Sequence, residues 1–130
     1  MGVDAANELA GKSFEEKCEW IKIKKEIGNN FVKENKIEEA LDTYLLSLCG
    51  FSFKDDDVTK EAIKEKDVEL KVPILNNMAL CLIRSKKYER ALSMLDQVVK
   101  IDPKNEKAHM RKCMAYIEMV DYERANRCLK

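Results

Sequence analysis

The sequence predicts an all-helical protein built from repeated antiparallel helix pairs, and three observations support this prediction. One apolar pattern occurs twice with identical internal spacing, at Tyr88, Ala91 and Leu95 and again at Tyr122, Ala125 and Leu129. The 130 residues include only four Gly and two Pro, and 37% of them are charged, a composition that favours helices. The apolar residues also follow the three- and four-residue spacing of a helix face.

The repeat pattern predicts how the chain is organised. The two sets are one period of about 34 residues apart. The same spacing occurs upstream at Ile37, Ala40 and Tyr44, displaced by one such period plus an insertion. We expect a flexible leader over residues 1–12 and one domain over 13–130, with repeats at about 21–54, 72–105 and 106–130 and the insertion at about 55–71. The helix-turn-helix repeats should stack as a right-handed solenoid. Since the chain stops within the second helix of the third repeat, we expect it to belong to a longer protein.

Local signals define the first helix. Ser13, followed three residues later by Glu16, forms a capping box that predicts a helix start. Asn35 is predicted to end this helix. An apolar stripe between them is expected to be buried, at Trp20, Ile23, Ile27 and Phe31.

Further apolar stripes define the other helices and are also expected to be core. The partner of the first helix carries Ile37, Ala40, Leu41, Tyr44 and Leu48. The second repeat pairs Leu75, Met78, Ala79 and Leu82 with Tyr88, Leu92, Leu95 and Val99. The third repeat opens with Met110, Cys113 and Tyr116. Small residues should allow the paired helices to approach closely, at the equivalent positions Gly28, Ala79 and Cys113.

The insertion is predicted to begin as a loop and to continue as a helix. Asp55, Asp56 and Asp57 suit a helix start, where negative charge meets the positive end of the helix dipole. From Thr59 the sequence favours a helix that extends the first helix of the second repeat upstream. Pro73 either kinks this helix or begins a new one.

Composition excludes several function classes. Lys+Arg and Asp+Glu both number 24, which argues against non-specific nucleic-acid binding, and no apolar run is long enough to span a membrane. The five cysteines contain no closely spaced pair and the chain has one His, so we expect neither disulfides nor a metal site. We interpret the cysteines as small buried residues of a protein in a reducing, cytoplasmic compartment.

No constellation of residues indicates catalysis or a cofactor. His109 is the one histidine, and we expect it to face a neighbouring helix as a structural residue. The chain also lacks a Gly-rich phosphate loop and a nucleophile elbow. The chain is therefore predicted not to be an enzyme and to bind no cofactor or small-molecule substrate.

Polar residues on the first helices of the repeats form the candidate site. Lys25 and Asn29 are four residues apart and share one helix face, and Lys107 and Arg111 repeat this spacing. Asn77 lies in the matching stretch of the second repeat. First helices line the concave surface of a repeat stack, so these five side chains should converge on one groove. Each could also be an ordinary solvated residue, but together their N–H donors favour carboxylates.

The period, the small residue at Ala91 and the closing Pro103 resemble the tetratricopeptide repeat, and residues 13–130 resemble the tetratricopeptide domains of heat-shock protein 90 and 70 co-chaperones. That family holds a ligand in a two-carboxylate clamp, whose pattern matches Lys25–Asn29 (KEIGN), Asn77 and Lys107–Arg111 (KAHMR). The resemblance implies that the clamp binds the last Asp of a Glu-Glu-Val-Asp tail. Lys25, Asn29 and Asn77 would bind the terminal carboxylate, Lys107 the Asp side chain, and Arg111 an upstream carboxylate or carbonyl.

The long insertion and the segment from Ala79 to Tyr88 are similar to those of immunophilin-type peptidyl-prolyl isomerases. This similarity implies that an isomerase domain exists elsewhere in the full-length protein. Arg84 is either a solvated residue or a further attraction for acidic ligands.

An alternative function is a scaffold that binds an internal segment of a partner through apolar contacts in the groove. The candidate residues for these contacts are Val32, Leu80, Ile83 and Met114.

Overall fold

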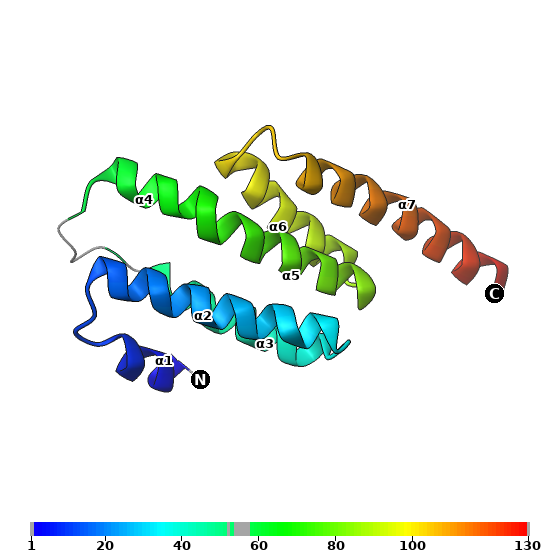
Figure 1. Ribbon diagram of the computed structural model, residues 1–130. Coiled ribbons are helices and arrows are strands. Elements are labelled where there is room, and N and C mark those ends of the chain that lie inside the picture. Colours follow the sequence, from blue (N-terminus) through cyan, green and yellow to red (C-terminus); the bar gives the residue numbers. More distant parts are fainter. Residues whose placement is uncertain (1, 52, 54–57, 130) are drawn as a thin grey trace. The chain divides into compact units, whose positions relative to one another are not determined.

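The computed structural model describes residues 2–51, 53 and 58–129 and contains only helices within those ranges (Figure 1). The chain divides into two compact units, residues 1–74 and 75–130, which are described in turn. The first unit contains α1 (Gly2–Leu9), α2 (Phe14–Lys33), α3 (Ile37–Leu48), the 3-10 helix η1 (Cys49–Phe51), α4 (Lys60–Lys66) and the π-helical turn η2 (Asp67–Lys71). Helix α5 (Val72–Arg84) begins in the first unit and continues into the second, which also contains α6 (Tyr88–Ile101) and α7 (Glu106–Leu129).

The N-terminal segment is a helix rather than the flexible leader that we expected. Helix α1 covers residues 2–9 and contacts η1. Glu8 Oε2 accepts a hydrogen bond of 2.8 Å from the indole Nε1 of Trp20 and lies 3.7 Å from Lys24 Nζ. These polar contacts attach α1 to α2, and composition alone did not indicate them.

The capping box at the start of α2 is confirmed. Ser13 Oγ accepts a hydrogen bond from the backbone N–H of Glu16, and Glu16 Oε1 accepts one from the backbone N–H of Ser13. Hydrogen bonds with the backbone and the side chain of Ser13 lower the pKa of the Glu16 carboxyl, and the backbone hydrogen bond has the larger effect. The negative carboxylate thus occupies the N-terminal turn, where the helix dipole favours it.

Helices α2 and α3 pair closely around a glycine. Tyr44 of α3 is completely buried, and its ring lies against the backbone of α2 at Gly28. A Cβ atom added at Gly28 would lie 2.6 Å from Tyr44 Cε1. The predicted role of a small residue at this position is therefore confirmed in the first repeat.

The predicted core stripe of α2 is wrong at two of its four positions. Ile23 and Ile27 are 53% and 39% exposed, whereas Trp20 is buried and Phe31 is half-buried. The buried face runs instead through Ile21 and Gly28, two helical turns apart. At about 100° per residue, Ile23 and Ile27 lie well away from that face.

The two turns between paired helices use the same geometry. Asn35 and Lys86, which occupy equivalent positions of the first and second repeats, both have positive φ angles, 60° and 62°. In each turn the next residue donates its N–H to a carbonyl five residues earlier, Lys36 to Phe31 and Lys87 to Leu82, both at 2.8 Å. A residue in the left-handed conformation at this point lets the following N–H groups bond to the last carbonyls of the helix, and the chain reverses its direction there. The predicted helix end at Asn35 is confirmed.

The insertion passes into the second repeat through a π-helical turn. Thr59 Oγ1 accepts a hydrogen bond from the backbone N–H of Ala62 and caps α4. The helix that we predicted to begin at Thr59 is therefore confirmed. Pro73 follows η2 as the second residue of α5. A π turn widens the helix where proline lacks its N–H, so the chain stays helical through the proline. Asp55, Asp56 and Asp57 lie outside the described residues.

In the second repeat, the predicted core is largely confirmed. Leu75, Met78, Ala79 and Leu82 of α5 are all at most 2% exposed. On α6, Tyr88 and Leu95 are buried together with Ala91 and Val98. Leu92 and Val99 are half-buried, because the inner face of α6 runs through Leu95 and Val98 instead.

The third repeat departs from the prediction, because α7 is one continuous helix of 24 residues with no turn near residue 120. Met110 and Tyr116, expected in the core, are 71% and 54% exposed, and Cys113 is exposed as well. Among the residues of α7 whose burial is described, the buried ones are instead Ala108 and Ala115, two turns apart on one face. The smallest side chains therefore lie on the buried face of α7, which contacts α6.

The expectation that all cysteines are buried is also only half correct. Cys18 and Cys81 are buried, and burial raises the pKa of both thiols. Cys49 and Cys113 are exposed. The side chain of Cys128 lies outside the described part of the chain.

Replacing Gly28 tests the close approach of α2 and α3. We expect Gly28→Val to lower the free energy of unfolding by about 1–3 kcal/mol, because the added methyl groups overlap the Tyr44 ring. Urea unfolding measures this difference. The matched control is Ser93→Val at an exposed position of α6, which should change stability by less than about 0.5 kcal/mol. Equal effects of the two substitutions would contradict the packing that we describe.

Candidate functional site

The predicted site residues of the first unit lie on one face of α2. Lys25 and Asn29 are both half-buried, one turn apart. The Tyr44 hydroxyl donates a hydrogen bond of 2.5 Å to Asn29 Oδ1. Because the carbonyl oxygen of this amide takes the tyrosine proton, its NH₂ group is directed to the other side. Asn29 is thus oriented as a donor by a residue of the partner helix.

A carboxylate of the insertion interacts electrostatically with Lys25. The hydrogen bond from the Lys66 ammonium lowers the pKa of the Glu69 carboxyl, and the charges of Lys22 and Lys25 act in the same direction. Lys66 Nζ is 3.1 Å from Glu69 Oε2. Glu69 is an exposed residue whose main partner is Lys66, so the attraction between Lys25 and Glu69 is a weak one.

The predicted site residues of the second unit lie on α5 and α7. Asn77 of α5 and Arg111 of α7 are half-buried, and Lys107 is exposed one turn before Arg111. Arg111 Nη1 donates a hydrogen bond of 2.6 Å to the backbone carbonyl of Asn76. This contact fixes the guanidinium beside α5, close to the residue that precedes Asn77. Burial raises the pKa of the Cys81 thiol, and the positive charges of Arg84 and Arg111 act in the opposite direction and lower it.

A network of amide side chains supports the position of Arg111. Asn105 precedes α7, and its Oδ1 accepts hydrogen bonds from the backbone N–H of Ala108 at 2.8 Å and from Asn76 Nδ2 at 3.1 Å. Asn105 Nδ2 donates to Asp102 Oδ2 at 3.2 Å. Since the Ala108 N–H can only donate, Oδ1 of Asn105 must face α7, and Asn76 must present its own NH₂ group. Asn76 thereby links α5 to the start of α7.

Sequence reasoning missed Asn76 and Tyr44 as supporting residues of the site. Asn76 directly precedes the predicted Asn77, it is 3% exposed, and its Oδ1 has no hydrogen-bond partner among the described residues. Tyr44 was predicted only as core. An asparagine next to the buried residues Leu75 and Met78 of the predicted core is the signal that could have identified Asn76, because buried polar side chains are usually hydrogen-bonded.

The structure therefore groups the five candidate residues into two sets. Lys25 and Asn29 belong to the first unit, and Asn77, Lys107 and Arg111 belong to the second. Four of the five are half-buried, and Lys107 is exposed. That all five converge on one groove remains a prediction from the sequence.

The additional contact residues differ in exposure. Val32 and Leu80 are half-buried, while Arg84 and Met114 are exposed. Ile83 is only 2% exposed, which leaves almost no surface for a ligand. His109, expected to face a neighbouring helix, is exposed, and its Nε2 lies 2.9 Å from the carbonyl oxygen of Pro103.

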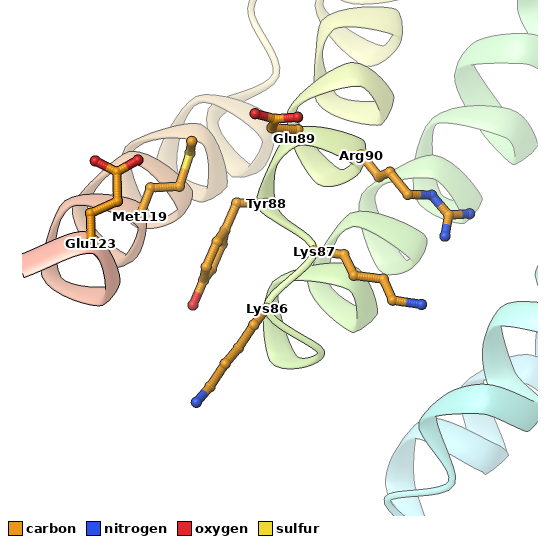
Figure 2. A pocket seen from close by; sticks show the side chains of 7 residues that line it. All are labelled: Lys86, Lys87, Tyr88, Glu89, Arg90, Met119 and Glu123. Carbon is orange, nitrogen blue, oxygen red and sulfur yellow. The ribbon is translucent and has the colours of Figure 1, made fainter. Parts of the chain in front are cut away.

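A pocket of about 350 Å³ lies away from these residues, at the start of α6 (Figure 2). Lys86, Lys87, Tyr88, Glu89 and Arg90 line it from the turn and first residues of α6, and Met119 and Glu123 line it from α7. None of the five candidate residues contributes to it. Positive and negative side chains both line the pocket, so it shows no preference for a ligand of one charge.

The described residues contain no cluster of three His, Cys, Asp or Glu side chains that could hold a metal ion. Among them there is also no helix with the length and apolar character needed to cross a membrane.

Comparison with known proteins identifies the repeat. The family described as tetratricopeptide repeat matches residues 82–130. The peptidyl-prolyl cis-trans isomerase FKBP42 of Arabidopsis thaliana is 34% identical over 94 residues, 71% of this chain and 25% of that protein. The human peptidyl-prolyl cis-trans isomerase FKBP4 is 27% identical over 122 residues, 94% of this chain and 26% of that protein. The chain thus spans about a quarter of the length of these curated relatives.

A solved structure agrees in fold. The C-terminal TPR-containing domain of an FK506-binding protein from Plasmodium falciparum matches 92% of this chain and 78% of that chain, with a TM-score of 0.76 and 28% identity. The helix pairs, the repeated turn geometry and these similarities lead to one assignment. The chain is a tetratricopeptide-repeat domain, homologous to those of the FKBP-type immunophilins.

Proposed function

We propose that this domain is a co-chaperone adaptor that binds the acidic C-terminal tail of heat-shock protein 90 or 70. The observation that carries the proposal is the set of five donor residues at clamp spacing. Two of them are held by neighbouring helices, because Asn29 accepts a hydrogen bond from the Tyr44 hydroxyl and Arg111 donates one to the Asn76 carbonyl. The relatives named as FKBP-type isomerases support the immunophilin resemblance from which the clamp pattern was taken.

The chemistry of the donors suits a peptide that ends in aspartate. Lys25, Asn29 and Asn77 would bind the main-chain carboxylate, and Lys107 and Arg111 would bind the side-chain carboxylate and the groups that precede it. A hydrogen bond to a charged group contributes about 1.5–3 kcal/mol. Several such bonds, reduced by the cost of association, are compatible with micromolar affinity, about −8 kcal/mol.

Preorganisation of the donors supports this affinity. The Tyr44 hydroxyl orients Asn29, and the Asn76 carbonyl orients Arg111 before any ligand arrives. Side chains that are already ordered lose less conformational entropy on binding. Lys107 is exposed and contributes mainly as a mobile charge that attracts acidic tails.

The proposal assigns no catalysis to this chain. Isomerase activity would belong to another domain of a longer protein, since the relatives are named as isomerases and this chain matches only about a quarter of their length. An isomerase assay on this chain should therefore give the uncatalysed rate. We also propose that this protein is cytoplasmic.

The first test is a calorimetric titration with a peptide that ends Met-Glu-Glu-Val-Asp. We expect micromolar binding of the free acid, weaker binding in higher salt, and loss of binding when the C-terminus is amidated, because amidation removes a carboxylate. Equal binding of the two peptides would eliminate the clamp. Binding that depends on the apolar residues Val32, Leu80 and Met114 instead would favour a scaffold for internal segments.

Substitutions test the individual donors. Lys25→Ala and Arg111→Ala should each weaken tail binding at least about tenfold, because each removes a charged hydrogen bond. The matched control is Lys100→Ala on α6, an exposed lysine outside the site, which should change the affinity less than about twofold. Similar losses in all three variants would mean that only the overall charge attracts the peptide.

Tyr44→Phe tests the positioning of Asn29. Removal of the hydroxyl should weaken tail binding about three- to tenfold, since Asn29 loses the bond that orients its amide. In an Asn29→Ala background, the same change should have no further effect on the affinity. Equal losses in both backgrounds would indicate that Tyr44 acts on stability and not through Asn29.

A further inference from the structure

The first half of α7 exposes an apolar surface that the second repeat buries. Cys113 and Tyr116 are exposed, whereas their equivalents one repeat earlier, Ala79 and Leu82, are 0% and 1% exposed. A cavity of about 500 Å³ lies on this part of α7, lined by His109, Met110, Cys113, Met114, Ile117 and Glu118. Ile117 and Met110 are 63% and 71% exposed. The exposed face of residues 109–118 is called the α7 face below.

The sequence contains the segment that would cover this face. In the second repeat, α5 is followed by a turn and by α6, which begins Tyr88-Glu-Arg-Ala91 and continues to Leu95. Residues 122–125 repeat this Tyr-Glu-Arg-Ala sequence without change, and Leu129 repeats Leu95. The second half of α7 thus has the sequence of a covering helix.

The second half of α7 does not turn back onto the first half of the same helix. The backbone is helical from Glu106 to Leu129, as Figure 1 shows, so residues 121–129 extend away from residues 109–118 along one axis. The turns after α2 and α5 depend on Asn35 and Lys86, which adopt positive φ. Their equivalent in the third repeat is Val120, two positions before Tyr122 as Lys86 is before Tyr88. A β-branched residue strongly disfavours that conformation, so the helix continues through it.

We propose that the α7 face is covered by residues 121–129 of a second copy of this chain, in a reciprocal, domain-swapped dimer. Two continuous α7 helices lie antiparallel across a two-fold axis close to Val120. Residues 121–129 of each copy then cover the α7 face of the other. The occupant is specified by the internal repeat, because the covering segment has the same sequence signature as α6. The proposal depends on the geometry of α7 and not on the proposed tail binding.

The dimer makes a prediction about Val120 that no other use of the α7 face makes. Val120→Asn introduces the residue that forms the turn at Asn35, so residues 121–129 should fold back onto their own chain and yield a monomer. Val120→Ala also removes the valine side chain but favours the continuous helix, so it should leave the dimer intact.

Sedimentation equilibrium of the whole chain at concentrations between about 1 and 100 µM tests the proposal. At the highest concentration, a dimer with a dissociation free energy of about 5.5 kcal/mol or more is detected. We expect the unmodified chain and Val120→Ala to approach twice the chain mass, and Val120→Asn to stay at the chain mass with unchanged helical circular dichroism. A monomer for the unmodified chain over this range would overturn the proposal. So would a dimer that Val120→Asn does not weaken.

A second variant keeps the test independent of the turn. Tyr116→Glu places a charge on the α7 face at a residue that is 54% exposed, so the chain should fold and the dimer should dissociate at least about tenfold more readily. Leu45→Glu, at a residue 45% exposed on α3, is the matched control and should not affect association. An unchanged dimer in Tyr116→Glu, or equal weakening in Leu45→Glu, would contradict the swap.

Discussion

A left-handed residue at the end of the first helix decides whether each repeat of this protein forms a helix pair. Asn35 and Lys86 adopt positive φ, and the N–H of the next residue closes the same hydrogen bond in both turns. Neither residue is glycine, so each turn carries a small conformational cost that the burial of the paired helices offsets. Val120 occupies the equivalent position of the third repeat, where the cost is larger, and α7 stays straight.

The helix pairs determine which polar side chains are held in place. Tyr44 can reach Asn29 only because Gly28 allows its ring to lie against the backbone of α2. Arg111 is fixed through a different arrangement, in which the Asn76 side chain links α5 to Asn105 at the start of α7. Two of the five candidate donors are therefore positioned by residues that a motif search does not examine.

The sequence predicted those elements whose signals are local. The capping box at Ser13, the helix end at Asn35 and the core of the second repeat depend on short-range spacing, and all are confirmed. Burial was predicted less well, because an apolar stripe does not state which face a partner will cover. Ile23 and Ile27 lie well away from the face that pairs with α3, and Met110 lies nearly opposite the alanines that are buried in α7. Tyr116 directly follows Ala115 and lies to one side of that buried face.

For the candidate site, spacing predicted which residues share a face, but not what holds them. The contacts of Asn29 and Arg111 come from residues 15 and 35 positions away in sequence, a separation that periodicity does not reveal. The helix at residues 2–9 was missed for a similar reason. Its link to α2 is a hydrogen bond between Glu8 and Trp20, which composition does not indicate.

The central claim is the proposed binding of one carboxylate-ended peptide by the five donor residues. The most direct measurement follows the side-chain amide signals of the asparagines by ¹⁵N nuclear magnetic resonance during a titration with the free-acid tail peptide. The account predicts that the signals of Asn29 and Asn77 shift together with one binding constant, while that of the exposed Asn7 stays unchanged. Shifts confined to one unit, or to residues of the α7 face, would contradict a shared clamp.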